Sequence, residues 1–123
     1  MKRGEIWWAD LGSQRPLEQT GRRPVVVWQS ETLSRVLHSV LVVPLTTNME
    51  RARLAGTAVI AATEVGPPAD SVALAFQMRA VPKDVLSKRI RPLTDFEMAE
   101  LDLATDEALG RIEPGQTASE TSR

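Results

Sequence analysis

The apolar segments of this chain are short and β-branched, and turn residues or polar stretches separate them. Segments of about four to eight such residues are typical of strands, whereas a helix needs about ten or more. A doubly wound α/β fold would need a helix between successive strands, and no segment between them is long enough. The pattern therefore predicts a mainly β fold, a small antiparallel and partly closed barrel. Its strands are expected at residues 5–9, 23–28, 39–44, 57–61, 71–77 and 87–92.

One long helix is expected after the last strand. Thr94 and Glu97 have the spacing of a capping box, in which each side chain satisfies a backbone N–H group at the helix start. Gly110 is a typical stop signal. Shorter helical pieces are expected at 29–37, as a loop or irregular helix, and at 82–86, as a single turn. Five residues at helical spacing predict the face of the long helix that packs on the sheet: Met98, Leu101, Thr105, Ala108 and Ile112.

Basic and acidic residues are unevenly divided along the chain. Residues 1–92 hold 13 Lys or Arg and 8 Asp or Glu, whereas residues 93–123 hold 2 and 8. A basic body suits an anionic ligand such as RNA, although charge alone favours an ordinary domain beside an acidic helix face. We expect one domain at residues 1–112, followed by a disordered tail at 113–123 that has almost no apolar side chains.

Composition excludes several kinds of site. The chain has no cysteine, so it has no disulfide and no thiolate nucleophile, and its single histidine, His38, excludes a multi-histidine metal site. A magnesium site made of carboxylates stays open, although no metal or other cofactor is expected. The sequence has neither a signal-peptide pattern nor a run of about 20 apolar residues, as a membrane span requires. The lack of cysteine fits a reducing cytoplasm.

Arg23 and Pro24 form the segment with the most specific chemistry. Pro24 favours an extended backbone at Arg23 and removes one donor from the strand ladder, so the two residues mark a strand entrance. A cation that is fixed at a rigid strand edge is well placed to bind a phosphate. Taken alone, however, a surface arginine more often pairs with a carboxylate.

Thr46 and Thr47 end an apolar strand with two hydroxyl groups. If that strand pairs with 23–28, Thr46 lies beside Arg23, and the two side chains could stabilise charge that develops on one phosphate. A turn in which these threonines bond their own backbone explains the same sequence equally well.

Two further segments carry candidate ligand-binding residues. Glu18 and Gln19 lie on a long polar loop, where Glu18 could accept a hydrogen bond from a ribose hydroxyl or a base, although most loop carboxylates are simply solvated. In segment 71–79, period-two alternation places small and polar residues on one face that could hold a ligand: Ser71, Ala73, Ala75, Gln77 and Arg79. The solvent side of an edge strand would give the same pattern.

The aromatic residues favour packing over recognition. Trp7, Trp8 and Trp28 could stack a nucleobase, but packing in a core or a dimer is the more common use of tryptophan. With no tyrosine and two phenylalanines in the chain, an aromatic RNA-binding sheet of the RRM type is not expected.

Four segments occur in a characteristic order: KRGEIWWADL at 2–11, EQTGRRPVVV at 18–27, VLVVPLTT at 40–47, and DSV through QMR at 70–79. Together they resemble the MazF/PemK-like family of toxin endoribonucleases from bacterial toxin–antitoxin pairs. The resemblance covers about residues 2–110, so only the tail lies outside it. Each segment alone is weak, and the order and spacing of all four carry the resemblance.

The resemblance implies an SH3-like barrel that forms a homodimer and cleaves single-stranded RNA or mRNA at short sequences without a metal. It implies attack by a 2′-hydroxyl, which leaves a 2′,3′-cyclic phosphate and a 5′-hydroxyl. A cognate antitoxin, with an acidic segment in the RNA groove, and a bacterial cytoplasmic location are implied as well. By position, Arg23 and Thr46 match the catalytic residues. The candidate RNA-binding residues are Glu18, Gln19, Thr47, Ser71, Gln77 and Arg79.

Two segments depart from the family pattern. Residues 29–31 read Gln-Ser-Glu where the family often has Asn-Asp, and residues 80–84 replace a common Thr-x-Asp-Lys. These changes affect the groove and hence the cleavage sequence. Two other functions stay open: a toxin of the same barrel superfamily that poisons DNA gyrase, and a non-catalytic RNA- or protein-binding barrel. Arg23 together with Thr46 argues against both, because neither needs a phosphate-cleaving pair.

Overall fold

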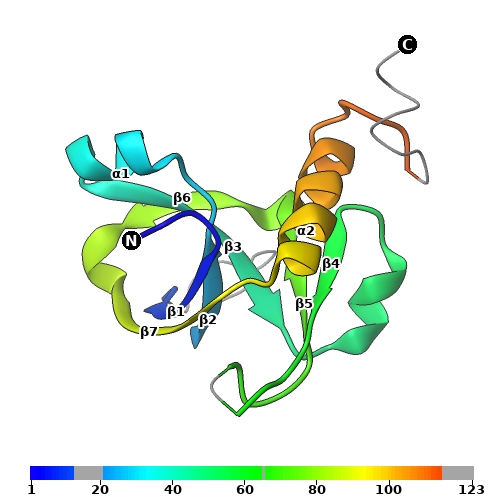
Figure 1. The fold of residues 1–123 in the computed structure, drawn as a ribbon, viewed down its shortest axis with the longest axis horizontal. Helices are drawn as coiled ribbons and strands as arrows, with labels where there is room; N and C mark the ends of the chain where they lie inside the picture. Colours follow the sequence, from blue (N-terminus) through cyan, green and yellow to red (C-terminus); the bar gives the residue numbers. More distant parts are fainter. Residues whose placement is uncertain (13–20, 65, 115–123) are drawn as a thin grey trace.

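The computed structural model describes residues 1–12, 21–64 and 66–114, and seven strands and two α-helices lie within them (Figure 1). The strands are β1 (Glu5–Asp10), β2 (Arg22–Val27), β3 (Ser39–Thr46), β4 (Thr57–Ile60), β5 (Ser71–Leu74), β6 (Arg79–Pro82) and β7 (Leu86–Pro92). The helices are α1 (Glu31–Val36) and α2 (Asp95–Ala108), with single 3₁₀ segments at η1 (Met49–Arg53), η2 (Ala75–Gln77) and η3 (Lys83–Val85).

The strands form one antiparallel sheet in the order β4–β5–β3–β2–β1–β7, and β6 pairs with β3. The two strands at the ends of this order, β4 and β7, do not pair with each other within the described residues. The sheet therefore stays open along a seam between them. Arg91 of β7 bridges the seam, because its Nη2 donates to the carbonyl oxygen of Ala61 (3.0 Å) and its Nη1 donates to Glu97 of α2 (2.8 Å). The mainly β class that the sequence predicts is confirmed, but the sheet does not close into the expected barrel, because β4 and β7 do not pair with each other among the described residues.

Two hydrophobic clusters lie on opposite faces of the central strands. Alternation along β2 sends Val26 into one cluster and Val25 and Val27 into the other, and all three valines are 0% exposed. The first cluster lies under α2 and includes Leu101, whereas the second includes Val81 of β6 and Leu86 of β7. A strand that is covered on both faces has a continuous apolar run, which is what the sequence of β2 contains.

Helix α2 begins with the predicted capping box. The backbone N–H of Glu97 donates to Thr94 Oγ1 (3.1 Å), and the backbone N–H of Thr94 donates to the carboxylate of Glu97 (2.9 Å). The helix is tied to the sheet by Trp28, whose Nε1 donates to Thr105 Oγ1 (2.9 Å). In the described part of the chain, no helix is long and apolar enough to cross a lipid bilayer.

Several details of the predicted elements are wrong, and the strand β6 at Arg79–Pro82 was not expected. The strand expected at 71–77 ends at Leu74, where η2 begins, and its residues are buried on both faces instead of alternating between polar and apolar surroundings. Phe76, expected on the apolar face, is 43% exposed. On α2, Ala108 is exposed, and Ala104 is buried against the sheet instead.

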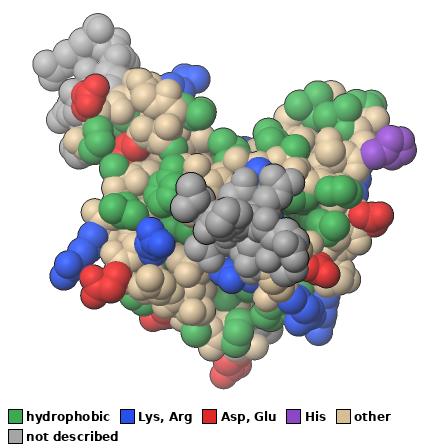
Figure 2. Space-filling model, turned by 180° about the vertical axis from the view of Figure 1, so that it is seen from behind, with side chains coloured by type: hydrophobic (Ala, Val, Ile, Leu, Met, Phe, Trp, Pro, Cys, Tyr) green, Lys and Arg blue, Asp and Glu red, His purple; other side chains and the backbone are tan. Residues whose placement is uncertain are grey.

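Helix α1 lies within the segment 29–37 that was expected to be a loop or short helix, and it projects at one end of the molecule (Figure 1). Two apolar residues of α1 and the residue that follows it face solvent, with Leu33 46%, Val36 72% and Leu37 40% exposed. Figure 2 shows apolar side chains gathered at this end, beside the exposed His38. A contiguous exposed apolar patch of this kind commonly marks an interaction surface.

Candidate active site

Arg23 is fixed at the entrance of β2. It pairs with Ala9 of β1, and its Nη1 donates to the carbonyl oxygen of Leu45 on β3 (3.2 Å). Partial burial lowers the pKa of Arg23 from its ordinary value, yet a guanidinium remains protonated at neutral pH. The neighbouring strand therefore holds a permanent positive charge at the strand edge.

Thr46 ends β3 at the level of Arg23. The register of β2 and β3 ends with the pair Val25 and Pro44, and Thr46, two residues beyond Pro44, pairs with Val72 of β5. Continuing the register of β2 and β3 by two residues would bring Arg23 to the level of Thr46 and both side chains to the same face of the sheet. Thr46 is 8% exposed, and its Oγ1 accepts a hydrogen bond from the backbone N–H of Asn48 (3.2 Å). The oxygen of this hydroxyl thus accepts a hydrogen bond within its own turn, and its hydrogen can still be donated to another group.

A hollow of about 230 Å³ opens beside this strand end and is called the Arg23 hollow here. Three of the predicted site residues line it, namely Arg23, Thr47 and Ser71. Ser71 is 2% exposed, and its hydroxyl donates to the carbonyl oxygen of Ala69 (3.0 Å), so its side chain is committed to its own turn. Trp8, Arg22 and Pro68 complete much of the wall.

The other predicted site residues lie elsewhere. Arg79 begins β6, donates from Nη2 to the carbonyl oxygen of Leu11 (3.2 Å), and lines a second hollow of about 390 Å³ with the end of β1. Gln77 is half-buried in η2. Glu18 and Gln19 fall outside the described residues, so the structure does not describe their position. The face predicted to join Ser71, Gln77 and Arg79 is therefore divided by η2.

Arg22, Trp8 and Lys88 are site neighbours that the sequence reasoning did not select. The guanidinium of Arg22 lies over the ring of Trp8, 4.4 Å from its centroid, and Trp8 pairs with Lys88 across β1 and β7. The sequence marks the arginine at the strand entrance, but it favours packing as the role of Trp8. Lys88 is 80 residues from Trp8 along the chain, and only the pairing of β1 with β7 joins them.

The described residues contain no group of three or more His, Cys, Asp or Glu that could hold a metal ion. What the strand end does offer is a fixed cation, a buried hydroxyl and an adjoining hollow of about 230 Å³. Such a set can bind a phosphate and stabilise the extra negative charge of a pentacovalent phosphorus.

A family model described as "PemK-like, MazF-like toxin of type II toxin-antitoxin system" matches residues 2–109. Among curated proteins, "Endoribonuclease MazF" of Staphylococcus saprophyticus is 33% identical over 110 residues, which cover 89% of this chain and 92% of the relative. "Endoribonuclease EndoA" of Bacillus subtilis is 34% identical over 113 residues, which cover 92% of this chain and 97% of the relative.

Solved structures match the fold as well. MazF of Deinococcus radiodurans superposes with a TM-score of 0.75 at 19% identity, over 89% of this chain and 96% of that one. An endoribonuclease from mycobacterial species, solved in complex with its cognate antitoxin, superposes with a TM-score of 0.73 at 24% identity, over 93% of this chain and 99% of that one. At these identities the superpositions establish the shared fold.

Proposed function

This chain belongs to the family of PemK-like, MazF-like toxins of type II toxin–antitoxin systems, and from that premise we propose that it is an endoribonuclease toxin in which Arg23 and Thr46 act on the scissile phosphate. The curated relatives that cover most of this chain are named endoribonucleases. We therefore assign cleavage of single-stranded RNA or mRNA at short sequences as its activity.

The proposed reaction needs no metal. The 2′-hydroxyl of one nucleotide loses its proton and attacks the adjacent phosphorus, which becomes pentacovalent and gains negative charge. The bond to the 5′-oxygen of the next nucleotide then breaks, that oxygen takes up a proton, and a 2′,3′-cyclic phosphate and a 5′-hydroxyl remain. Arg23 supplies the positive charge that the intermediate needs, and the hydroxyl of Thr46 donates a hydrogen bond to a phosphate oxygen.

One observation carries this proposal: the guanidinium of Arg23, at the entrance of β2, is bonded to Leu45, the residue directly before Thr46 at the end of β3. The hydrogen bond from Arg23 to Leu45 fixes the guanidinium before any ligand binds. A donor that is already oriented spends little energy on reorganisation during the reaction, which is why preorganised charges are effective. Thr47 and Ser71 line the Arg23 hollow, which supports a role for this wall in holding the RNA.

The test is cleavage of a long unstructured RNA in the presence of EDTA, with the fragment ends mapped by sequencing. We expect discrete cuts that carry 5′-hydroxyl ends. Arg23→Ala should lower the cleavage rate at least about a hundredfold, because it removes a donor to the developing charge. The variant should keep the fold of the original protein, since Arg23 lies at the sheet rim outside both hydrophobic clusters.

Arg53→Ala is the matched control. Its side chain is 83% exposed on η1, and its ion pair with Glu50 spans 3.5 Å on the surface. It removes the same charge and should cut RNA at the original rate. Full activity of Arg23→Ala would contradict the assignment of Arg23, and no cleavage by the unchanged protein on several RNAs would contradict the endoribonuclease, leaving a gyrase assay as the next step.

We also propose a cognate antitoxin, whose acidic segment would occupy the RNA groove that the family resemblance implies and fold on binding. Two of the solved neighbours support this partner, because the mycobacterial endoribonuclease is described in complex with its cognate antitoxin and the Deinococcus radiodurans structure is described as MazE–MazF. The named relatives come from bacteria, and a toxin that cleaves mRNA would act in the bacterial cytoplasm.

A further inference from the structure

The three tryptophans have different surroundings. Trp28 is 7% exposed and bonded to Thr105, and Trp7 packs against the second hydrophobic cluster. Trp8 is half-buried and lines two hollows at once, the Arg23 hollow on one side and a hollow of about 220 Å³ on the other. The hollow of about 220 Å³ is called the Lys88 hollow here, and Lys88, Arg89 and Glu64 also line it. Trp8 is thus a shared wall between two surface hollows.

Positive charges flank Trp8 on both sides. In the sheet register, Trp8 lies opposite Pro24 of β2 and opposite Lys88 of β7, so these three side chains project on the same face. The guanidinium of Arg22 lies over the Trp8 ring at 4.4 Å from its centroid, a geometry that is favourable for a cation and an aromatic ring. The Trp8 ring therefore holds Arg22 on the same surface as Lys88.

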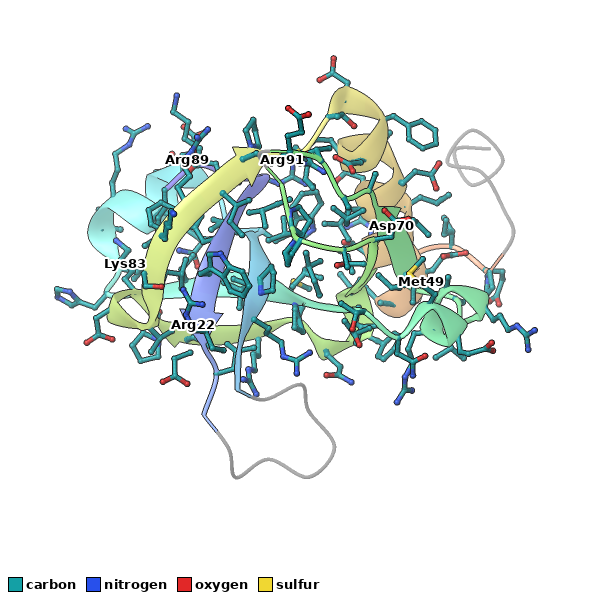
Figure 3. The ribbon with its side chains drawn as sticks, turned by 90° about the horizontal axis from the view of Figure 1, so that it is seen from below. Arg22, Met49, Asp70, Lys83, Arg89 and Arg91 are labelled. Carbon is teal, nitrogen blue, oxygen red and sulfur yellow. The ribbon has the colours of Figure 1, made fainter. Side chains whose placement is uncertain are left out.

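Both cations are exposed, and each has room to meet a phosphate. The described residues give Lys88 no ion pair, whereas its neighbour Arg89 is bonded through Nε to the carboxylate of Glu5. Figure 3 shows Arg22 and Arg89 on the β7 side of the molecule, far from Met49 of η1. Lys88 and Arg22 are accordingly the two cations that flank Trp8 on its open face.

The Lys88 hollow is lined by charges of both signs, because Glu64 lies in its wall with Lys88 and Arg89, and Arg89 is already paired with Glu5. A phosphate has no hydrogen-bond donor to offer the carboxylate of Glu64, whereas a nucleobase has. A carboxylate accepts hydrogen bonds from the N–H groups of a nucleobase, and the Trp8 and Ile90 side chains offer apolar contacts. The phosphates of a bound strand would then lie outside, against Lys88 and Arg22.

We propose that Trp8, Arg22 and Lys88 form a second RNA-binding site, which holds the nucleotide next to the scissile phosphate. Lys88 and Arg22 contact its backbone phosphates, Trp8 positions Arg22, and the base enters the Lys88 hollow. This proposal rests on the endoribonuclease function argued above. It extends the RNA path from the Arg23 hollow across β1 to β7.

The experiment measures binding of a 2′-O-methyl RNA that carries a mapped cut sequence, by fluorescence anisotropy at several salt concentrations. This RNA lacks the attacking hydroxyl, so it is bound without being cut. Each phosphate contact with a single strand contributes about 0.7 to the slope of log K against log salt. Lys88→Gln and Arg22→Gln should each lower the slope by about that amount, while the distant Arg53→Gln leaves it unchanged.

Trp8 is tested by a pair of substitutions. Trp8→Leu should weaken binding on the order of tenfold, because it removes the aromatic platform. Trp8→Phe keeps a ring under Arg22 and should restore most of the affinity. Circular dichroism checks that both variants are folded.

The second site alone would be overturned if the unmodified protein cuts RNA but the slope of log K against log salt is unchanged in Lys88→Gln and Arg22→Gln. A protein that cuts no RNA would instead contradict the proposed function. Because Lys88 is exposed on the surface, its substitution leaves the fold intact, and that variant gives a clear result even if Trp8→Leu fails to fold.

Discussion

At the scale of single residues, the two proposed catalytic groups differ in how they are held. Arg23 reaches across to the backbone of β3, whereas the hydroxyl of Thr46 is held within its own turn by Asn48. The arginine is therefore fixed by the sheet as a whole, and the threonine by a local hydrogen bond. Substitution of Thr46 consequently touches both the chemistry and the turn.

Thr46→Val is nearly isosteric and should lower the cleavage rate about a hundredfold, because it removes a hydrogen-bond donor to the phosphate. It also leaves the N–H of Asn48 without its acceptor, at a cost of about 1 kcal/mol in the free energy of unfolding. Single-turnover cleavage and urea unfolding measure the two effects separately. Thr46→Ser, which keeps the hydroxyl, is the control and should retain most of the rate, whereas unchanged turnover in Thr46→Val would reduce Thr46 to a turn residue.

The pairing of β2 with β3, which brings Arg23 near the end of β3, could be predicted from the sequence, because the two segments are consecutive apolar strands. The position of Arg79 could not. The sequence pattern extended a strand through 71–79, and nothing in the residue types marks the 3₁₀ segment that turns Gln77 and Arg79 away from Ser71. The stacking of Arg22 on Trp8 was also out of reach, since it depends on the register of β1 and β2.

At the scale of elements, the open seam is held by a buried ion pair. Nη1 and Nη2 of Arg91 donate to the two carboxylate oxygens of Glu97 at 2.8 and 3.1 Å, and the side chains are 9% and 7% exposed. Glu97 also accepts from the backbone N–H of Ala61, beyond the end of β4. One carboxylate thus ties together β7, the end of β4 and the start of α2. The capping box was predictable, but this second use of Glu97 depends on where β7 lies.

Glu97→Ala should lower the free energy of unfolding by about 3–5 kcal/mol, because it leaves the charge of Arg91 buried without its partner. Glu100→Ala, on the same helix, is the control and should change stability by about 0.5 kcal/mol or less. Urea unfolding at neutral pH measures both. Equal stability of the two variants would show that water satisfies Arg91 once Glu97 is gone.

Acid should destabilise the fold through two glutamates. Burial acts to raise the pKa of Glu97, but its hydrogen bonds with Arg91, Thr94 and Ala61 outweigh burial and lower it. The pKa of Glu5 is likewise lowered, because hydrogen bonds with Lys2, Arg89 and Trp7 outweigh its burial. A glutamate whose pKa is lowered by folding stabilises the fold fully when the pH is above the pKa of an unfolded glutamate. This stabilisation is lost as the pH falls through the pKa of the folded state. Urea unfolding between about pH 7 and pH 3 should show the decline, and it should be shallower in Glu97→Ala.

At the scale of the whole molecule, the homodimer that the family resemblance implies needs a surface, and we propose the exposed apolar residues of the α1 region, Leu33, Val36 and Leu37. Val36→Glu places a charge in the middle of this patch and should convert a dimer into a folded monomer, because Val36 is 72% exposed within one chain. Light scattering after gel filtration gives the mass. Thr32→Glu, on the same exposed helix, is the control, and a dimer that survives Val36→Glu would place its interface elsewhere.

Because Val25, Val26 and Val27 of β2 are fully buried in the two hydrophobic clusters, we expect their amide hydrogens to exchange with solvent only when the whole domain opens. Arg23 enters this strand and is bonded to Leu45 of β3, so its position depends on the same strand pairing. Heat should therefore inactivate the protein at the same temperature at which it melts, with no earlier loss of the site. Differences in the RNA sequence that members of this family prefer would then arise from substitutions in the loops and outer strands, because these can occur while the reacting centre stays rigid.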